Sequence, residues 1–148
     1  MGVTILKIIS IDPGFVPANN QQQKALELLN QIFRDKEINV VSDDNISFVD
    51  QGSNFDDVSC NCCHQLIDTV FGQETMDNAY ETGFTDLYFT TPCCNTITSL
   101  NDLSYNMPAG FSRFVICIEY PDYELTAQQL HELTLVLSTP IRLVYARY

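Results

Sequence analysis

Four cysteines in two groups constrain this sequence more than any other feature does. Cys60 and Cys63 are separated by two residues, and Cys93 and Cys94 follow later as an adjacent pair. A Cys-x-x-Cys spacing allows both thiolates to reach one ion, and zinc binds four such ligands in a tetrahedron at about 2.3 Å. We therefore predict one structural zinc site formed by Cys60, Cys63, Cys93 and Cys94, which ties the central part of the chain to a β-sheet.

The adjacent cysteines need a sharp turn to act as a ligand pair. Side chains on neighbouring extended residues point to opposite faces, so Cys93 and Cys94 reach one ion only if the backbone turns between them. Pro92 before the pair and Asn95 after it favour such a turn, because proline fixes φ and asparagine tolerates positive φ.

A second register of the same segment leaves the ligand set open. The stretch 91–95 can be laid over a Cys-Pro-x-Cys-Gly knuckle, with Thr91 in place of the first cysteine and Cys94 as the second. In that register Cys94 is the firm ligand of the pair. The candidates for the remaining ligand position are Cys62, His64 and Cys93.

Three other roles for the cysteines are alternatives to zinc binding. A redox Cys-x-x-Cys pair is disfavoured by Asp56 and Asp57, because nearby carboxylates are expected to raise the thiol pKa. A disulfide between Cys93 and Cys94 is disfavoured in a reducing compartment. The third alternative is a set of ordinary buried thiols that no longer bind metal.

The charge balance narrows the classes of partner. The chain has 148 residues, 19 of them acidic and 7 basic, for a net charge of -12. Phosphate backbones are bound through Lys and Arg, so we expect no binding to nucleic acid or to an anionic membrane. An acidic field attracts a basic protein instead. The N-terminal residues do not have the pattern of a signal peptide, and we expect a cytoplasmic protein with reduced thiols.

Periodicity and turn residues divide the chain into elements. Strands are predicted at residues 4–11, 86–91, 111–120 and 141–145, and helices at 74–81 and 126–137. A further helix is predicted after Asn19 and Asn20, with the apolar residues of 25–33 on one face and Lys24 and Arg34 on the other. The last helix has a capping box, Thr126 with Gln129, and Pro140 ends it. Residues 37–50 carry two β-like pieces around the polar cluster Ser42–Asn45, which favours a hairpin.

This order predicts an α+β fold of the ferredoxin-like, split β-α-β kind. Two helices would pack on one face of a mainly antiparallel sheet. We expect residues 1–148 to form a single domain, with a zinc-ribbon-like insertion at about residues 52–103.

Several short segments between residues 48 and 120 occur together in a known family. They are residues 48–52, 54–55, 60–63, 76–86, 92–94, 99–103 and 108–111. The chain resembles an uncharacterised family of small bacterial proteins that combine a Cys-Pro-x-Cys-Gly knuckle with a later Pro-Cys-Cys-Gly segment. Asn61 stands where the knuckle has proline, and His64 stands where it has glycine. The resemblance implies zinc at the two cysteine pairs and implies no activity.

Some members of that family are labelled sugar-transporter ATPases. This sequence has no G-x-x-x-x-G-K-[ST] loop to bind phosphates, which argues against that label here. We predict a non-catalytic, zinc-stabilised protein-interaction module. The alternatives are an acidic immunity or inhibitor protein that neutralises a basic bacterial toxin such as a nuclease, and a metal- or thiol-dependent enzyme.

Overall fold

The computed structural model describes residues 2–148 and confirms the α+β class. Its main sheet has four strands in the order β2-β7-β1-β8, and each neighbouring pair is antiparallel. The first and last strands of the chain therefore lie side by side. The strands are β1 (Thr4–Ser10), β2 (Ile38–Val49), β7 (Gly110–Glu119) and β8 (Ile141–Arg147).

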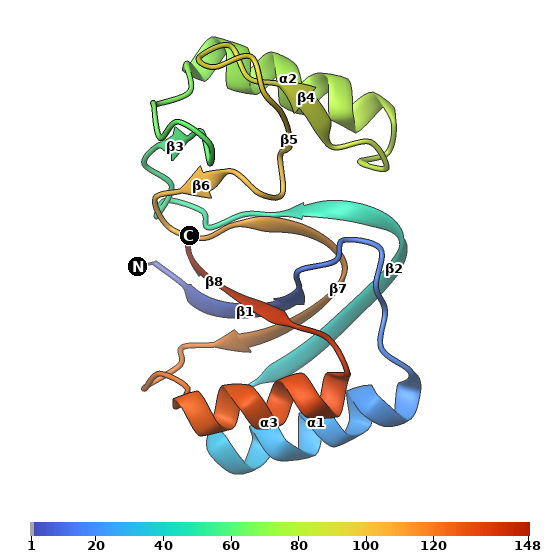
Figure 1. Ribbon diagram of the computed structural model, residues 1–148. Coiled ribbons are helices and arrows are strands. Elements are labelled where there is room, and N and C mark those ends of the chain that lie inside the picture. The colour runs from blue at the N-terminus through green and yellow to red at the C-terminus, as the bar shows by residue number, and fades with distance from the viewer. Residues whose placement is uncertain (1) are drawn as a thin grey trace.

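Two helices, α1 (Asn19–Ile32) and α3 (Ala127–Leu137), cover one face of this sheet (Figure 1). The predicted capping box of α3 is confirmed. The Thr126 hydroxyl accepts from the Gln129 N–H at 3.1 Å, and the Gln129 side chain accepts from the Thr126 N–H at 2.9 Å. Within residues 2–148, no helix combines the length and the apolar character that crossing a membrane requires.

The space between these helices and the sheet is filled by aliphatic and aromatic side chains. Alternate residues of β1 and β7 point into it and meet one face of each helix. Burying one such side chain contributes about 1.5–3 kcal/mol, so this layer supplies much of the stability. Its fully buried members include Leu6, Ile8, Leu29, Ile116, Ile118 and Leu133.

The predicted hairpin in residues 37–50 is wrong. β2 runs as one strand through the polar cluster and pairs with β7 on both sides of it. The register shifts between Ser42 and Ser47, so the cluster forms a β-bulge. Arg113 on β7 holds the bulge, because its Nε donates to the Asp43 carbonyl at 2.9 Å. A bulge exposes the polar residues to water without reversing the chain, which is why composition alone suggested a turn.

The chain between β2 and β7, residues 50–109, forms a separate layer that we call the central segment. In Figure 1 it lies on the opposite side of the sheet from α1 and α3. It leaves the sheet after Val49 and returns at Gly110, and these two residues are paired directly across β2 and β7. Its elements are β3 (Val58–Ser59), α2 (Thr69–Glu81), β4 (Tyr88–Thr90), β5 (Ile97–Ser99) and β6 (Ser104–Tyr105).

The central segment has its own small core. Phe111 of β7 is fully buried in it and contacts Phe48 and Phe84, with ring centroids 5.1 and 5.2 Å apart. The two-stranded pairs β3–β6 and β4–β5 are too short to be stable alone. Further contacts must therefore hold the central segment together. Its other buried apolar residues are Ile67, Ala79, Leu87, Leu100 and Leu103.

A close backbone contact at one end and an arginine side chain at the other fasten the central segment to β8. Gly52 has φ +59°, and a Cβ atom there would lie 2.3 Å from the Arg147 carbonyl oxygen. At the other end, Arg142 Nη1 donates to the carbonyl oxygens of Asn101 and Ala109 at 2.9 and 3.0 Å. These contacts join residues that are far apart in the sequence, so no local sequence pattern predicts them.

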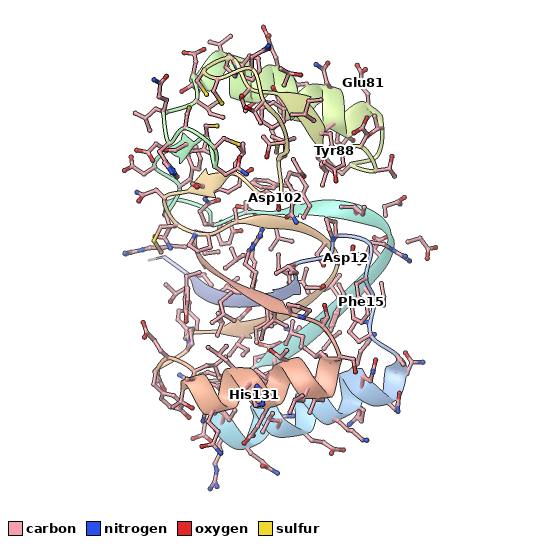
Figure 2. The ribbon with its side chains drawn as sticks, in the orientation of Figure 1. Asp12, Phe15, Glu81, Tyr88, Asp102 and His131 are labelled. Atoms are coloured by element: carbon pink, nitrogen blue, oxygen red, sulfur yellow. The ribbon has the colours of Figure 1, made fainter. Side chains whose placement is uncertain are left out.

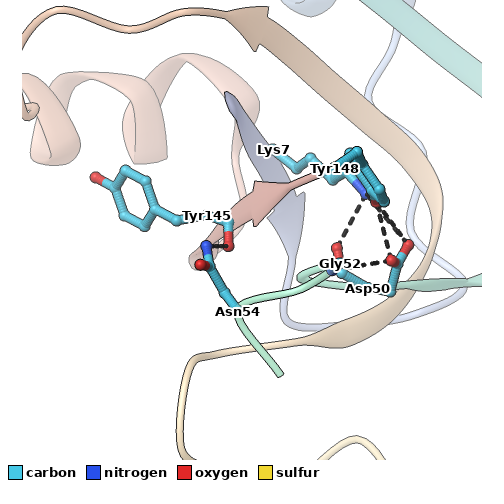
Figure 3. A network of polar contacts seen from close by, with 6 residues as sticks. All are labelled: Lys7, Asp50, Gly52, Asn54, Tyr145 and Tyr148. Atoms are coloured by element: carbon cyan, nitrogen blue, oxygen red, sulfur yellow. Dashed lines mark hydrogen bonds and ion pairs between the residues drawn. The ribbon is translucent and has the colours of Figure 1, made fainter. Parts of the chain in front are cut away.

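A polar network joins the start of the central segment to the edge of the sheet (Figure 3). Lys7 Nζ donates to the Tyr148 hydroxyl at 2.6 Å and lies 3.3 Å from the Asp50 carboxylate. The Tyr148 hydroxyl donates to the Asp50 carboxylate at 2.9 Å, and the Gly52 N–H donates to it at 3.0 Å. Partial burial raises the pKa of Asp50, but the Tyr148 hydrogen bond and the Lys7 charge outweigh it, so this pKa is lowered overall.

This network predicts an acid-dependent contribution to stability. Because the folded pKa of Asp50 is lowered, its stabilising effect is present above the unfolded value of 3.8 and is lost as pH falls through the folded pKa. The Asp50→Asn variant should therefore be less stable than wild type at about pH 6, and the difference should shrink toward about pH 3. Urea unfolding at both pH values measures it. Asp35→Asn removes an exposed carboxylate elsewhere, and an equal pH dependence in that control would contradict the assignment.

Candidate metal centre

The four predicted ligand residues lie together in the structure. The sulfur atoms of Cys60, Cys63, Cys93 and Cys94 all lie within 4.8 Å of one another. Cys60 Sγ is 3.8 Å from Cys94 Sγ, and Cys63 Sγ is 3.2 Å from Cys93 Sγ. Each close pair takes one sulfur from each half of the central segment. The cluster therefore joins two parts of the central segment to each other, and the expectation that it ties the segment to the main sheet was wrong.

The spacing of the sulfurs fits a tetrahedral metal ion. Zinc–sulfur bonds of about 2.3 Å place neighbouring sulfurs of a tetrahedron about 3.8 Å apart. The observed separations lie on both sides of this value, and the Cys60–Cys94 separation equals it. Four cysteine thiolates are also one of the donor sets that structural zinc sites use. The residues present therefore suit one such ion with small side-chain adjustments.

The first cysteine pair lies on a tight turn closed by backbone hydrogen bonds. The Cys60 N–H donates to the Gln65 carbonyl at 2.9 Å, and the His64 N–H donates to the Cys60 carbonyl at 3.0 Å. His64 has φ 65°, the left-handed conformation that glycine has in the knuckle pattern. The Cys62 N–H donates to Cys60 Sγ at 3.3 Å, which aims a backbone dipole at the sulfur.

The second pair lies on a turn with the same hydrogen bonds. The Thr91 N–H donates to the Thr96 carbonyl at 2.9 Å, and the Asn95 N–H donates to the Thr91 carbonyl at 3.0 Å. Asn95 has φ 58° and occupies the position of His64 in the first turn. The sharp turn expected around Cys93 and Cys94 is therefore present, and it follows the register that puts Thr91 in the place of a first cysteine.

Thr91 is the functional residue whose contacts the sequence did not reveal. It is buried, and its hydroxyl lies 3.2 Å from Cys94 Sγ while accepting from the Thr96 N–H at 3.0 Å. In the second turn it thus occupies the position that Cys60 occupies in the first turn. Because Thr91 supplies no thiol, the fourth sulfur of the cluster comes from Cys93 instead.

The alternative ligands stand apart from the cluster. Within residues 2–148, the cluster of potential metal ligands contains neither Cys62 nor His64, and both side chains are exposed. All six cysteines are free, so Cys93 and Cys94 do not form a disulfide with each other. Of the ligand sets left open by the sequence, the geometry favours the one that contains Cys93.

No family model, no curated protein and no solved structure matches this chain. A metal centre is supported by the geometry of the chain itself, namely the sulfur separations, the two matching turns and the burial of Cys60. A hydrogen bond of 3.0 Å from the Thr98 hydroxyl to the Asn61 side chain adds a second link between the two turns.

The backbone of the first turn favours a thiolate at Cys60. Hydrogen bonds from the N–H groups of Cys63 and Cys62 lower the pKa of the Cys60 thiol to about 6. The expected rise caused by Asp56 and Asp57 was wrong for this residue, because the two N–H groups point directly at its sulfur. The close contact with Cys63 raises the pKa of Cys93 to about 12, as expected for thiols that crowd around one position.

Proposed function

We propose that this chain is a non-catalytic protein-interaction module whose central segment is braced by one structural zinc ion. The ligands are Cys60, Cys63, Cys93 and Cys94, and the mutual approach of their sulfurs within 4.8 Å is the observation that carries the proposal. Four protein ligands leave no open coordination position, and closed zinc sites are structural rather than catalytic. This argues against the alternative of a metal-dependent enzyme. The free thiols suit a reducing, cytoplasmic setting.

The architecture we propose is a single domain with a ferredoxin-like scaffold and a zinc-ribbon-like insertion at about residues 52–103. The order β2-β7-β1-β8, with a helix after β1 and a helix after β7, supports the scaffold, since it is the order of a split β-α-β fold. Two cysteine turns at the ends of short β-hairpins support the insertion. The same turns support membership of the bacterial family that the sequence resembles.

Metal content and a relocated ligand test the zinc site. We expect about one zinc per chain in the purified protein, and cobalt to give the spectrum of a tetrahedral four-thiolate site. Cys93→Ser should weaken zinc binding by at least about tenfold, the loss expected when even a supporting partner of a ligand is removed. Adding Thr91→Cys to Cys93→Ser should restore it, because residue 91 occupies the first-cysteine position of the second turn.

The matched control for the relocated ligand is Thr90→Cys with Cys93→Ser. Thr90 is exposed and lies one residue outside the turn, so it should not restore binding. Equal zinc binding by the two double variants would contradict the proposed register. Purified protein without zinc, with no affinity for added zinc, would overturn the proposed function itself.

A second candidate, an immunity or inhibitor protein for a basic toxin, is favoured by one specific observation. The net charge of -12 suits fast capture of a cationic partner. If this candidate is correct, the protein should block the activity of a basic nuclease encoded next to it. Absence of any toxin gene from that neighbourhood would count against this candidate and leave the zinc-braced module in place.

A further inference from the structure

The central segment carries most of the net negative charge of this protein, because it contains no Lys or Arg to offset its carboxylates. No Lys or Arg occurs between Lys36 and Arg113, so residues 50–109 contain only acidic charges apart from His64. The nine acidic residues of this segment account for most of the net charge of -12. They are Asp50, Asp56, Asp57, Asp68, Glu74, Asp77, Glu81, Asp86 and Asp102.

A largely apolar cavity opens on the same layer. It has a volume of about 430 Å³ and lies between the first half of α2, the end of β2 and the turn that contains β6. Phe48, Phe71, Leu103 and Tyr105 form part of its wall. Pockets of this size and character bind apolar groups in proteins.

The mouth of this cavity combines exposed apolar side chains with carboxylates. Phe55 and Leu66 both line it, and they are 51% and 66% exposed. Asp56 and Asp57 lie beside Phe55, line the same cavity and are exposed to solvent. Among the described residues that line the cavity, none is Lys, Arg or His. A ligand that enters it thus meets an apolar wall and a negatively charged rim.

We propose that this cavity binds a basic segment of a partner protein, with an apolar side chain inserted and neighbouring Lys or Arg residues paired with Asp56 and Asp57. This inference rests on the proposed function, because it names the partner surface of the interaction module. Charge complementarity selects the occupant. The apolar wall buries the apolar side chain of the partner, and the carboxylates of the rim favour Lys or Arg residues on either side of it.

The distribution of charge favours a protein segment over a small cation. Carboxylates extend well beyond the cavity, for example to Glu81, which Figure 2 places on α2, and to Asp102, labelled nearer the main sheet. A field of this extent attracts a partner with several positive charges, whereas a small cation would meet only the rim.

Binding of a short probe peptide tests this proposal. The probe is an amidated peptide of sequence Arg-Phe-Leu-Arg, added to the zinc-loaded protein and followed by amide NMR shifts. The shifts should cluster around the cavity, and the affinity should fall when the salt concentration rises from about 0.05 M to about 0.5 M. Peptides of sequence Glu-Phe-Leu-Glu and Arg-Gly-Gly-Arg should each bind much more weakly, because one lacks the charge and the other lacks the apolar side chains.

Two double variants separate the rim from the net charge. Asp56→Asn with Asp57→Asn should weaken binding of the Arg-Phe-Leu-Arg probe by about tenfold, from the loss of two ion pairs. Glu74→Gln with Glu81→Gln removes the same charge from α2 outside the cavity and should weaken it by less than about twofold. Because these residues are exposed, all four substitutions should leave the fold intact.

Several results would overturn this proposal. The first is equal weakening of Arg-Phe-Leu-Arg binding by both double variants. The second is amide NMR shifts located away from the cavity. The third is binding of Arg-Gly-Gly-Arg, or of a simple alkylammonium ion, with the same affinity as Arg-Phe-Leu-Arg. Any of them, obtained with protein that retains its zinc, would refute the peptide site and leave the zinc-braced module standing. Loss of the zinc site is detected separately by metal content.

Discussion

Replacing Cys60 by Ser is expected to release the central segment while the helix-covered sheet stays folded. The β3–β6 and β4–β5 pairs are only two and three residues long, so the two cysteine turns depend on the link between them. Structural zinc contributes about 10–16 kcal/mol in zinc-finger peptides, which exceeds the total stability of many domains. Cys60 supplies the one buried sulfur of the cluster, and its loss should therefore remove most of what holds these turns together.

Hydrogen exchange resolved by segment measures this effect. In Cys60→Ser, amides in residues 58–67 and 88–99 should exchange at least about a hundredfold faster, equivalent to about 2.7 kcal/mol of lost local stability. Amides of β1 and β7, which face the core beneath α1 and α3, should keep their protection. Chelation of the metal from the wild-type protein should reproduce the same pattern.

Cys62→Ser is the matched control, because Cys62 lies next to the cluster, is exposed and falls outside the group of four sulfurs. It should exchange like the wild type. Equal loss of protection in both variants would show that any substitution in the turn disrupts it. Loss of protection in β1 as well in Cys60→Ser would show that the two layers do not unfold separately.

Gly52→Ala is expected to be among the most destabilising single substitutions, at about 3 kcal/mol or more. Gly52 has φ +59°, and an added Cβ would lie 2.3 Å from the Arg147 carbonyl oxygen. The backbone fixes the position of the added Cβ, and the oxygen belongs to the backbone of Arg147, so no side-chain rotation can relieve the clash. Relief requires moving the start of the central segment off β8.

Gly83→Ala separates the steric clash from the backbone conformation. Gly83 has φ +68°, and no atom lies within 4 Å of the Cβ position. It should therefore cost only the left-handed conformation, about 1–2 kcal/mol. Unfolding in urea gives both values. Equal losses for the two variants would mean that the contact between Gly52 and Arg147 does not constrain the fold.

Local signals account for the parts of the fold that the sequence predicted well. The capping box of α3 involves residues three positions apart, and its hydrogen bonds form as expected. The alternation in β7 likewise places Phe114, Ile116 and Ile118 in the core. Such patterns depend on neighbouring residues, and neighbouring residues are what a single sequence displays.

The start of α2 shows how packing changes a local preference. The sequence predicted a helix at residues 74–81, but α2 begins at Thr69, after the Asp68 side chain accepts from the Phe71 N–H at 3.2 Å. Glycine and β-branched residues in this first turn are weak helix formers. Phe71 nevertheless packs against Phe89 in a tilted arrangement, with ring centroids 6.1 Å apart, and this contact stabilises the longer helix.

The candidate site was predictable only in part, because contacts between elements far apart in the sequence form only when those elements pack together. Thiol spacing identified the four cysteines, because ligand chemistry limits which residues can share an ion. The apolar cavity has walls from β2, α2 and the turn around β6, and it exists only after these elements pack together. The contact between Arg142 and Asn101 also crosses elements, so no spacing in the chain foretold it.

The direct pairing of Val49 with Gly110 means that the central segment leaves the sheet and returns to it at one place. Paired residues on antiparallel strands lie about 5 Å apart, a gap that a two-residue turn closes in ordinary hairpins. A lineage can thus acquire, exchange or discard the cysteine-bearing layer by a change at one place, without rethreading the strands. The cysteine-bearing layer and the helix-covered sheet thus meet the chain at one pair of neighbouring residues.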